Sequence, residues 1–233
     1  MKINETILSL LIHIFYPHTC LGCGSDIIGK ENLLCLQCVN DLGHADFVYY
    51  SNNPIEKVFW GRIPVHAAMS EFYFSKSSII QNVILQFKYR GNREAGVSLG
   101  RFMGKSLKNT NRFLNIDFLV PILLFTRKEF KREFNQSALL CADIHEVTHI
   151  PVMAKNVTRI IPTETQTKKG RIKRWENVEK SFHVSKPIQL EGKHILPVDD
   201  VITTRATLEA CSGEILKVKG VRIGIATLSM VTS

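Results

Sequence analysis

Two adjacent acidic residues and a group of threonines lie close together in the C-terminal third of the chain. Asp199 and Asp200 follow the apolar segment 195–198. Neighbouring carboxylates suit sugar hydroxyls or a hydrated Mg²⁺ ion. Hydroxyl residues at the start of a helix, with its free N–H groups and positive dipole end, suit a phosphate. The loop that follows the acids contains three such residues: Thr203, Thr204 and Thr207. The pattern predicts a binding site for a sugar that carries phosphate groups.

An ordinary strand–loop–helix unit offers a simpler explanation of the same residues. Such a unit can carry an acid after its strand and a threonine as its helix cap. That explanation accounts for one acid and one threonine, whereas residues 199–207 contain two acids and three threonines. We therefore favour a binding function for this segment.

Four cysteines near the N-terminus follow the pattern C-x₂-C-x₁₁-C-x₂-C: Cys20, Cys23, Cys35 and Cys38. Two close pairs of thiolates can complete a tetrahedron around Zn²⁺. Two disulfides, or redox-active CxxC motifs, are the alternatives. Nothing in the sequence indicates secretion, and a redox motif usually occurs singly. We expect a structural zinc site, whose closed Cys₄ shell leaves no position for a reacting ligand.

The remainder of the chain alternates between apolar segments and amphipathic segments. We expect strands at 67–74, 116–124, 152–161, 195–198 and 221–228, and helices at 75–89, 94–107 and after Thr207. Such alternation predicts an α/β fold in which a parallel sheet is flanked by helices. Ligands bind such sheets at the carboxyl ends of the strands, where the acidic pair is placed.

Length and composition set the domain plan. A chain of 233 residues with 45% hydrophobic and 22% charged residues allows one sizeable globular domain and a small module. We expect residues 1–54 to form an N-terminal helix and the Cys₄ module, and residues 55–233 to form the α/β domain. The apolar run 7–15 is too short to span a bilayer, so we expect a cytoplasmic protein. The net charge of +9 favours anionic partners such as a phosphorylated substrate or nucleic acid.

The segment 195–207, ILPVDDVITTRAT, resembles the phosphoribosyl diphosphate (PRPP) signature of the type I phosphoribosyltransferases. With its upstream segments, nearly the whole chain resembles the ComF family of bacterial competence proteins. The resemblance implies an amidophosphoribosyltransferase-like open parallel sheet, preceded by a zinc-ribbon-like finger. It implies that Asp199 and Asp200 are catalytic and hold the ribose hydroxyls, directly or through Mg²⁺. The 5′-phosphate would lie against Thr203, Thr204, Arg205, Ala206 and Thr207.

Two further segments match the family through individual residues. The loop that holds the diphosphate in phosphoribosyltransferases would correspond here to Pro121, Arg127, Arg132, Asn135 and Gln136. The forked donors of its two arginines suit diphosphate oxygens, although a basic surface loop would look similar. The flexible loop that closes over the diphosphate would correspond to the basic segment that contains Gln166, Arg174 and Asn177.

The sequence departs from the family pattern at four positions. Phe125 replaces a histidine, and Glu133 replaces a glycine, where its charge would repel a diphosphate by ~1 to 4 kcal/mol. Pro197 cannot donate a hydrogen bond within its strand. Arg205 replaces the glycine of the phosphate loop, where it would either fill the pocket or bind the phosphate itself.

The departures leave two functions open. The first is a transferase (a glycosyltransferase) in which a nitrogen nucleophile displaces diphosphate from C1 of PRPP. The alternative is a non-catalytic protein of the DNA-uptake machinery that binds single-stranded DNA or competence proteins. Whether the protein is an active enzyme, and which acceptor it would use, does not follow from the residues.

Overall fold

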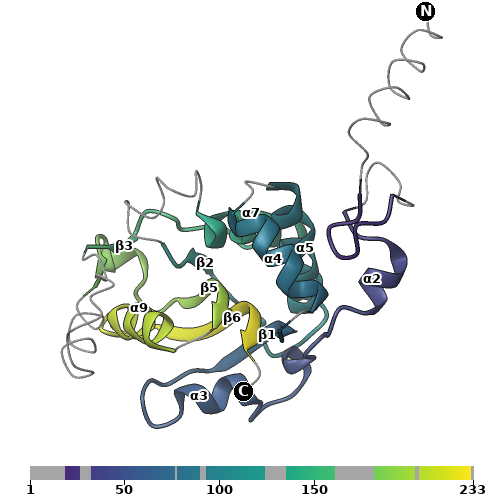
Figure 1. Cartoon of the computed structure of the whole chain (residues 1–233). Helices are drawn as coiled ribbons and strands as arrows, with labels where there is room; N and C mark the ends of the chain where they lie inside the picture. Colours follow the sequence, from purple (N-terminus) through teal and green to yellow (C-terminus); the bar gives the residue numbers. More distant parts are fainter. Residues whose placement is uncertain are drawn as a thin grey trace, which may run out of the picture.

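The structure is a computed structural model that describes residues 19–26, 33–76, 78–89, 93–123, 135–160, 181–202 and 205–231. At its centre lies a parallel sheet with the strand order β1-β6-β5-β2 (Figure 1). Its strands are β1 (Ala67–Phe74), β2 (Phe118–Pro121), β5 (His194–Ile202) and β6 (Arg222–Val231). The α/β fold with a parallel sheet flanked by helices is therefore confirmed.

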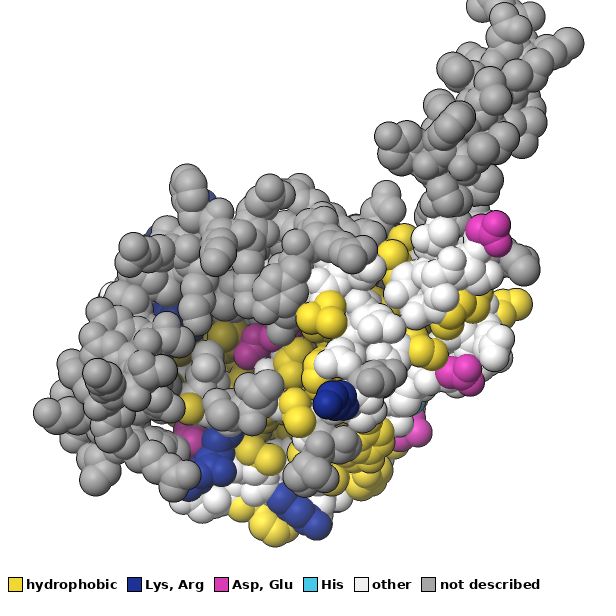
Figure 2. Space-filling view, in the orientation of Figure 1, with side chains coloured by type: hydrophobic (Ala, Val, Ile, Leu, Met, Phe, Trp, Pro, Cys, Tyr) yellow, Lys and Arg dark blue, Asp and Glu magenta, His cyan; other side chains and the backbone are white. Residues whose placement is uncertain are grey.

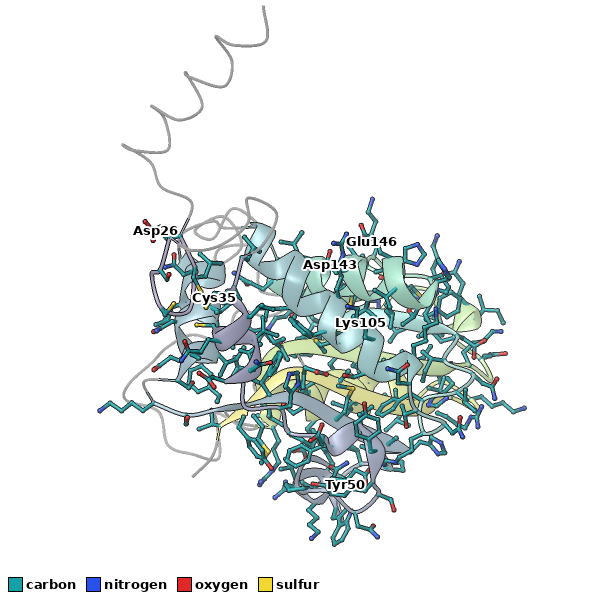
Figure 3. All side chains as sticks on the ribbon, turned by 90° about the vertical axis from the view of Figure 1, so that its right-hand side faces the viewer. Asp26, Cys35, Tyr50, Lys105, Asp143 and Glu146 are labelled. Carbon is teal, nitrogen blue, oxygen red and sulfur yellow. The ribbon has the colours of Figure 1, made fainter. Side chains whose placement is uncertain are left out.

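Two groups of elements cover the two faces of this sheet (Figures 1 and 3). The first face carries α4 (Ile79–Tyr89), α5 (Arg93–Lys108) and α7 (Gln136–Thr148). The second face carries the 3₁₀ helix η1 (Phe47–Tyr49), α3 (Pro54–Phe59), α9 (Ala206–Leu216) and a hairpin of β3 (Val157–Arg159) and β4 (Phe182–Val184). A second 3₁₀ helix, η2 (Pro187–Gln189), precedes β5, and α2 (Leu36–Asn40) belongs to the Cys₄ module.

Alternating side chains of the strands divide the core into two clusters. In β5, Leu196 and Val198 belong to the cluster under α4, α5 and α7, whereas Ile195 belongs to the cluster under α3 and α9. This follows from the two-residue period of a strand, which sends successive side chains to opposite faces. Because both faces are covered, the central strands are apolar on both sides, as their sequences predict.

Pro197 lies inside the central strand β5. The carbonyl of Val198 accepts a hydrogen bond from Ile122 on the β2 side (2.9 Å), so the nitrogen of Pro197 faces β6. On the β6 side, Ile195 pairs with Ile223 and Val198 pairs with Ala226, whereas residues 196 and 197 between them have no partner in β6. The strand accommodates the proline because only the hydrogen-bond ladder with β6 is interrupted. On the other side, Pro197 still pairs with Val120 of β2.

Helices α5 and α7 approach each other closely because α5 presents glycines to its neighbour. A Cβ on Gly100 would lie 2.5 Å from the Cβ of Asp143, and one on Gly104 would lie 2.8 Å from the Cβ of Val147. Only residues without a side chain fit at such a distance. This contact fixes the position of α7, whose first turn reaches the edge of the sheet.

Short segments of chain cover both edge strands of the sheet. Residues 43–45 run antiparallel to β1, and the N–H of Tyr73 donates to the carbonyl of Gly43 (2.8 Å). At the other edge, the N–H of Leu119 in β2 donates to the carbonyl of Pro151 (2.9 Å). Both edges therefore have backbone partners from the same chain.

The proposed domain boundary at residue 54 falls in a tightly bound segment. Asn53 is fully buried, and its amide group donates to the carbonyls of Phe47 (2.9 Å) and Ala68 (2.8 Å). The side chain of Glu56 pairs with Arg112. Residues on both sides of the boundary thus pack into the same core, and the division into residues 1–54 and 55–233 stays a prediction.

The expectation of a helix at residues 7–15 lies outside the described residues. Within the described part of the chain, every helix is too short or too polar to cross a membrane.

Candidate functional site

The acidic pair lies in the last four residues of β5, at the carboxyl edge of the sheet. Both carboxylates are half-buried. The Oδ1 atom of Asp199 accepts hydrogen bonds from Ser137 Oγ on α7 (3.1 Å) and from the backbone N–H of Asp200 (2.9 Å). The Oδ1 atom of Asp200 accepts from the N–H of Val201 (2.5 Å). The strand therefore continues through the acids instead of ending before them, and α7 orients the first carboxylate.

The end of β2 and the start of α7 meet beside this pair. Asn135 caps α7, because its Oδ1 accepts from the N–H of Ala138 (2.9 Å), and its Nδ2 donates to the carbonyl of Ile122 (3.5 Å). These contacts place Pro121, Asn135 and Gln136, three of the predicted diphosphate residues, near Asp199. Arg127 and Arg132, together with Phe125 and Glu133, lie outside the described residues.

The start of α9 forms the next part of the site. Arg205 adopts helical dihedral angles (φ −61°, ψ −18°), so the positive φ that only glycine adopts cheaply is not required here. Its Nε lies 3.6 Å from Oε2 of Glu209, one turn along the helix. Glu209 also accepts from Arg62 (Nη1 to Oε1, 3.4 Å). Ala206 and Thr207 occupy the first turn of α9 and are half-buried, whereas Thr203 and Thr204 lie outside the described residues.

The hairpin of β3 and β4 contributes a residue that the sequence analysis missed. The guanidinium group of Arg159 lies over the ring of Phe182 (5.4 Å to its centroid). Burial lowers the pKa of Arg159, and the negative charge of Asp199 raises it, so the two side chains lie within electrostatic range. The connection between β3 and β4 contains the predicted flexible-loop residues Gln166, Arg174 and Asn177, which lie outside the described residues.

Ser137 was also missed from sequence, although a signal for it existed. It directly follows Asn135 and Gln136, which were assigned to the diphosphate loop, and it sits where the first turn of α7 faces β5. For Arg159 the available signal was weaker: a single basic residue in a predicted strand. Ser137 contacts Asp199 through a hydrogen bond, and Arg159 lies within electrostatic range of the same carboxylate.

The four predicted metal ligands converge in the N-terminal module. The sulfur atoms of Cys20, Cys23, Cys35 and Cys38 all lie within 4.8 Å of one another. The Sγ atoms of Cys23 and Cys35 are 3.9 Å apart, too far for a disulfide and close to the spacing of about 3.8 Å that tetrahedral Zn–S bonds of ~2.3 Å require. The described residues thus contain a Cys₄ cluster that could bind a structural zinc ion.

Local backbone geometry supports this arrangement of thiolates. The N–H of Cys35 donates to Cys20 Sγ (3.3 Å), and the N–H of Cys38 donates to Cys35 Sγ (3.4 Å). Burial raises the pKa of Cys20, but backbone N–H groups, led by that of Cys23, lower it to about 6. A Cβ on Gly22 would lie 2.8 Å from Cys38 Sγ, so the first turn of the module needs a glycine.

The Cys₄ module rests against α4. Cys20 and Cys38 belong to the same core cluster as Ile80 and Val83, and Asn82 Nδ2 donates to the carbonyl of Gly22 (3.4 Å). Beside this contact, a cleft of about 600 Å³ lies between residues 19–24 of the module and α4. The residues described as lining the cleft come from these two segments, and none of them lies at the sheet edge. The other two cysteines, Cys141 and Cys211, are fully buried thiols, as predicted.

These features define a class of protein: an α/β domain with a half-buried acidic pair at the edge of a parallel sheet, and a Cys₄ cluster before it. Comparison with known proteins narrows this class. The chain is 31% identical over 129 residues to the DNA utilization protein YhgH of Escherichia coli, covering 54% of this chain and 56% of that protein. The chain thus spans little more than half of that relative.

Two competence proteins match a larger share of the chain. Competence protein F of Haemophilus influenzae is 24% identical over 210 residues, which covers 85% of this chain and 90% of that protein. Competence protein ComFC of Bacillus subtilis is 25% identical over 160 residues, covering 69% and 62%. These matches support the assignment of the chain to the ComF family, which the resemblance over nearly the whole chain predicts.

Two other comparisons add less. No family model matches the chain. Among solved structures, the chain aligns with a hypothetical protein from Neisseria gonorrhoeae with bound ppGpp. The alignment covers 60% of this chain and 69% of that protein, with a TM-score of 0.38 and 17% sequence identity. At this level of similarity neither its fold nor its ligand transfers to this chain.

Proposed function

We propose that this ComF-type protein binds a PRPP-type phosphosugar with Mg²⁺ and acts in competence or DNA uptake. The observation that carries the phosphosugar proposal is the position of Asp199 and Asp200. They lie half-buried at the carboxyl edge of a parallel sheet, beside the first turns of α7 and α9. Ligands of open α/β sheets bind at this edge. The relatives named for competence and DNA utilization support the cellular role.

Each part of the site has a role in this proposal. The two carboxylates bind the ribose hydroxyls, and their all-oxygen donor set fits Mg²⁺, which would neutralise charge on the diphosphate. The 5′-phosphate binds at the first turn of α9, where Ala206 and Thr207 offer backbone N–H groups and a hydroxyl. Asn135 and Gln136 form the diphosphate side of the site, with Arg127 and Arg132 from the preceding loop.

The position of Arg205 bears on whether the phosphate loop is usable. Its helical dihedral angles mean that a residue other than glycine is not strained at this position. Its guanidinium group extends along α9 to Glu209, so it lies beside the first turn of the helix. In this proposal Arg205 adds positive charge near the phosphate. Catalysis would be displacement of diphosphate at C1 by a nitrogen nucleophile, with the protein supplying position and charge stabilisation.

The phosphosugar proposal is tested by calorimetric titration of the protein with PRPP in the presence and absence of Mg²⁺. We expect saturable binding that depends on Mg²⁺ and that Asp199→Asn and Asp200→Asn each weaken at least tenfold. Asp117→Asn is the matched control, because Asp117 lies at the opposite end of the same sheet, where it accepts from the N–H of His194 (2.8 Å). Equal binding by all three variants would contradict the proposal.

A non-catalytic role in binding single-stranded DNA or competence proteins is the second candidate. The net charge of +9 and the names of the relatives favour it. Filter binding of oligonucleotides at low salt tests it, because electrostatic contacts to phosphates are strongest there. A protein that binds PRPP but no DNA under these conditions would support the first candidate alone.

Three further statements belong to the same proposal. The Cys₄ cluster binds Zn²⁺ as a folding or docking element, since all its ligand positions are filled by protein. Residues 1–54 and 55–233 form the N-terminal module and the phosphoribosyltransferase-like domain. The protein works in the cytoplasm, where reducing conditions keep the four thiols available for metal.

A further inference from the structure

An exposed group of aromatic side chains lies on the face of the sheet that carries η1 and α3. Tyr49, Tyr50 and Trp60 are 55%, 47% and 58% exposed, and Tyr73 at the end of β1 is 37% exposed. Figure 3 shows Tyr50 on the opposite side of the sheet from Lys105 of α5 and Glu146 of α7. We call Tyr49, Tyr50, Trp60 and Tyr73 the aromatic surface. It lies apart from the Cys₄ module and uses none of the residues assigned to the phosphosugar.

The aromatic surface is anchored to the core. The fully buried ring of Phe47 makes edge-to-face contacts with Tyr50 (centroids 6.0 Å apart) and Tyr73 (5.3 Å). The amide group of Asn53, which starts α3, donates to the carbonyls of Phe47 (2.9 Å) and Tyr50 (3.1 Å). These contacts hold the backbone under the rings in place before any ligand arrives. A rigid surface loses little conformational entropy when it binds.

Positive charge accompanies these rings. The ammonium group of Lys57 lies 5.8 Å from the centre of the Trp60 ring, whereas Arg62, two residues later, is paired with Glu209 of α9 (3.4 Å). Residues 47–66 contain one acid, Glu56, which is buried and paired with Arg112. The exposed acid that borders the segment is Asp46. In Figure 2, hydrophobic side chains and Lys or Arg side chains lie next to one another along the lower edge of the molecule, around α3.

Exposed rings beside cations suit a ligand with flat apolar groups and a negatively charged backbone. Bases stack on Tyr and Trp, whatever their sequence, while Lys and Arg contact the phosphates. The six-residue helix α3 spans about 9 Å at ~1.5 Å per residue, so rings at its two ends can contact different nucleotides. A duplex hides its bases from such a surface, which selects for single strands.

We propose that the aromatic surface binds single-stranded DNA by base stacking, with Lys57 contacting the backbone. This inference rests on the DNA-binding part of the proposed function and assigns it to a defined surface. The phosphosugar is bound elsewhere, at the sheet edge, so the two activities can be lost separately.

The chain offers a direct reporter, because Trp60 and Trp175 are its two tryptophans. In Trp175→Phe, Trp60 becomes the remaining tryptophan, and a base stacked on it quenches its fluorescence. We expect saturable quenching of this variant by oligo-dT. Trp60→Leu and Tyr50→Leu should each weaken oligo-dT binding about tenfold in fluorescence anisotropy, the loss typical of one stacked base. Tyr50→Phe, which keeps the ring, should bind like the wild type.

Ile188→Ala is the matched control, since Ile188 is 73% exposed and lies on η2, apart from these rings. Thermal unfolding shows that each variant is folded, and PRPP titration reports on the sheet edge separately. Unchanged oligo-dT affinity in folded Trp60→Leu and Tyr50→Leu overturns the assignment. So does equal affinity for duplex DNA, or a protein partner that is lost from these variants while DNA affinity remains. If the wild type binds PRPP but no oligo-dT at low salt, this inference fails while the phosphosugar proposal stands.

Discussion

The Cys₄ module and the sheet edge are built in opposite ways. In the module, four ligands from 19 consecutive residues meet in one small volume, and the turns between them supply most of the geometry. At the sheet edge, Asp199 on β5 is oriented by Ser137 on α7, and α7 is positioned by its packing against α5. The first region depends on local turns that bring together four thiols able to bind a metal, and the second depends on the core. The following experiments test this difference.

The largest effect should come from the metal ligands. We expect Cys20→Ser, or removal of zinc by a chelator, to cost several kcal/mol, because ligand binding and folding of such modules are coupled. Cys20 and Cys38 share a core cluster with α4, so the loss should also lower the melting temperature of the whole protein. Metal analysis and calorimetry provide the measurement. A zinc content that stays unchanged in Cys20→Ser would contradict the assigned ligand set.

The next effect concerns the helix contact that positions the sheet edge. Gly100→Ala places a methyl group 2.5 Å from the Cβ of Asp143, so α5 and α7 must separate, at a cost of about 1–3 kcal/mol. Gly213→Ala on α9 is the control, because its new methyl group meets nothing within 4 Å. That variant should be stabilised by roughly 0.5–1 kcal/mol. Urea unfolding of both variants measures the difference, and equal effects would show that the helix contact is less tight than described.

A buried carboxyl group in the same contact predicts a dependence on pH. Burial, aided by Glu146 and opposed by Arg101, raises the pKa of Asp143 to about 6 from 3.8. The folded protein therefore favours the protonated form of Asp143. The free energy of unfolding that this preference contributes is fully present below pH ~4 and is lost as the pH rises through about 6. We expect Asp143→Asn to lose less stability than the wild type between pH 4 and pH 7, by about 1–3 kcal/mol. Identical pH profiles in urea unfolding would show that Asp143 is not responsible.

The smallest effect should come from Ser137. Ser137→Ala removes the hydroxyl that donates to Asp199, and we expect PRPP affinity to fall by a factor of about 3–10 while stability changes by roughly 1 kcal/mol or less. The control is Ser106→Ala on α5, a helix on the same face of the sheet as α7. It removes a comparable hydrogen bond, from Ser106 to Glu71 (3.0 Å), and should leave PRPP affinity unchanged. An equal loss in both variants would point to a general change in stability.

The same contrast decides what could be predicted from sequence. The cysteine spacing was sufficient to predict the cluster, because ligands so close in the chain can be arranged in few ways. The structure confirms the cluster. Strand β1 was placed at its observed bounds, Ala67–Phe74, a mostly apolar segment that contains Ser70 and Glu71. Within the described residues, the strand expected at 116–124 is regular over Phe118–Pro121, although Asp117 and Ile122 still donate backbone hydrogen bonds to β5.

Errors arose where contacts between distant segments decide the outcome. The strand 195–198 extends through Asp199 and Asp200 to Ile202, because pairing with β6 continues at Asp199, Val201 and Ile202. The backbone at Arg205, where a glycine was expected from the family pattern, has helical dihedral angles, so it does not require glycine. Ser137 and Arg159 could not be ranked from sequence, because nothing local reveals that Ser137 bonds to Asp199 or that Arg159 lies within its electrostatic range. The roles of the individual residues at the sheet edge remain predictions.

The covered edges of the sheet limit how this protein can associate with others. With residues 43–45 against β1 and the segment around Pro151 against β2, the backbone groups that would template another strand are already occupied. A visiting polypeptide therefore cannot pair with these covered positions, which opposes edge-to-edge self-assembly, the usual hazard of an open sheet. Recognition through exposed side chains avoids this obstacle, and such rings and charges can be altered by mutation without disturbing the framework.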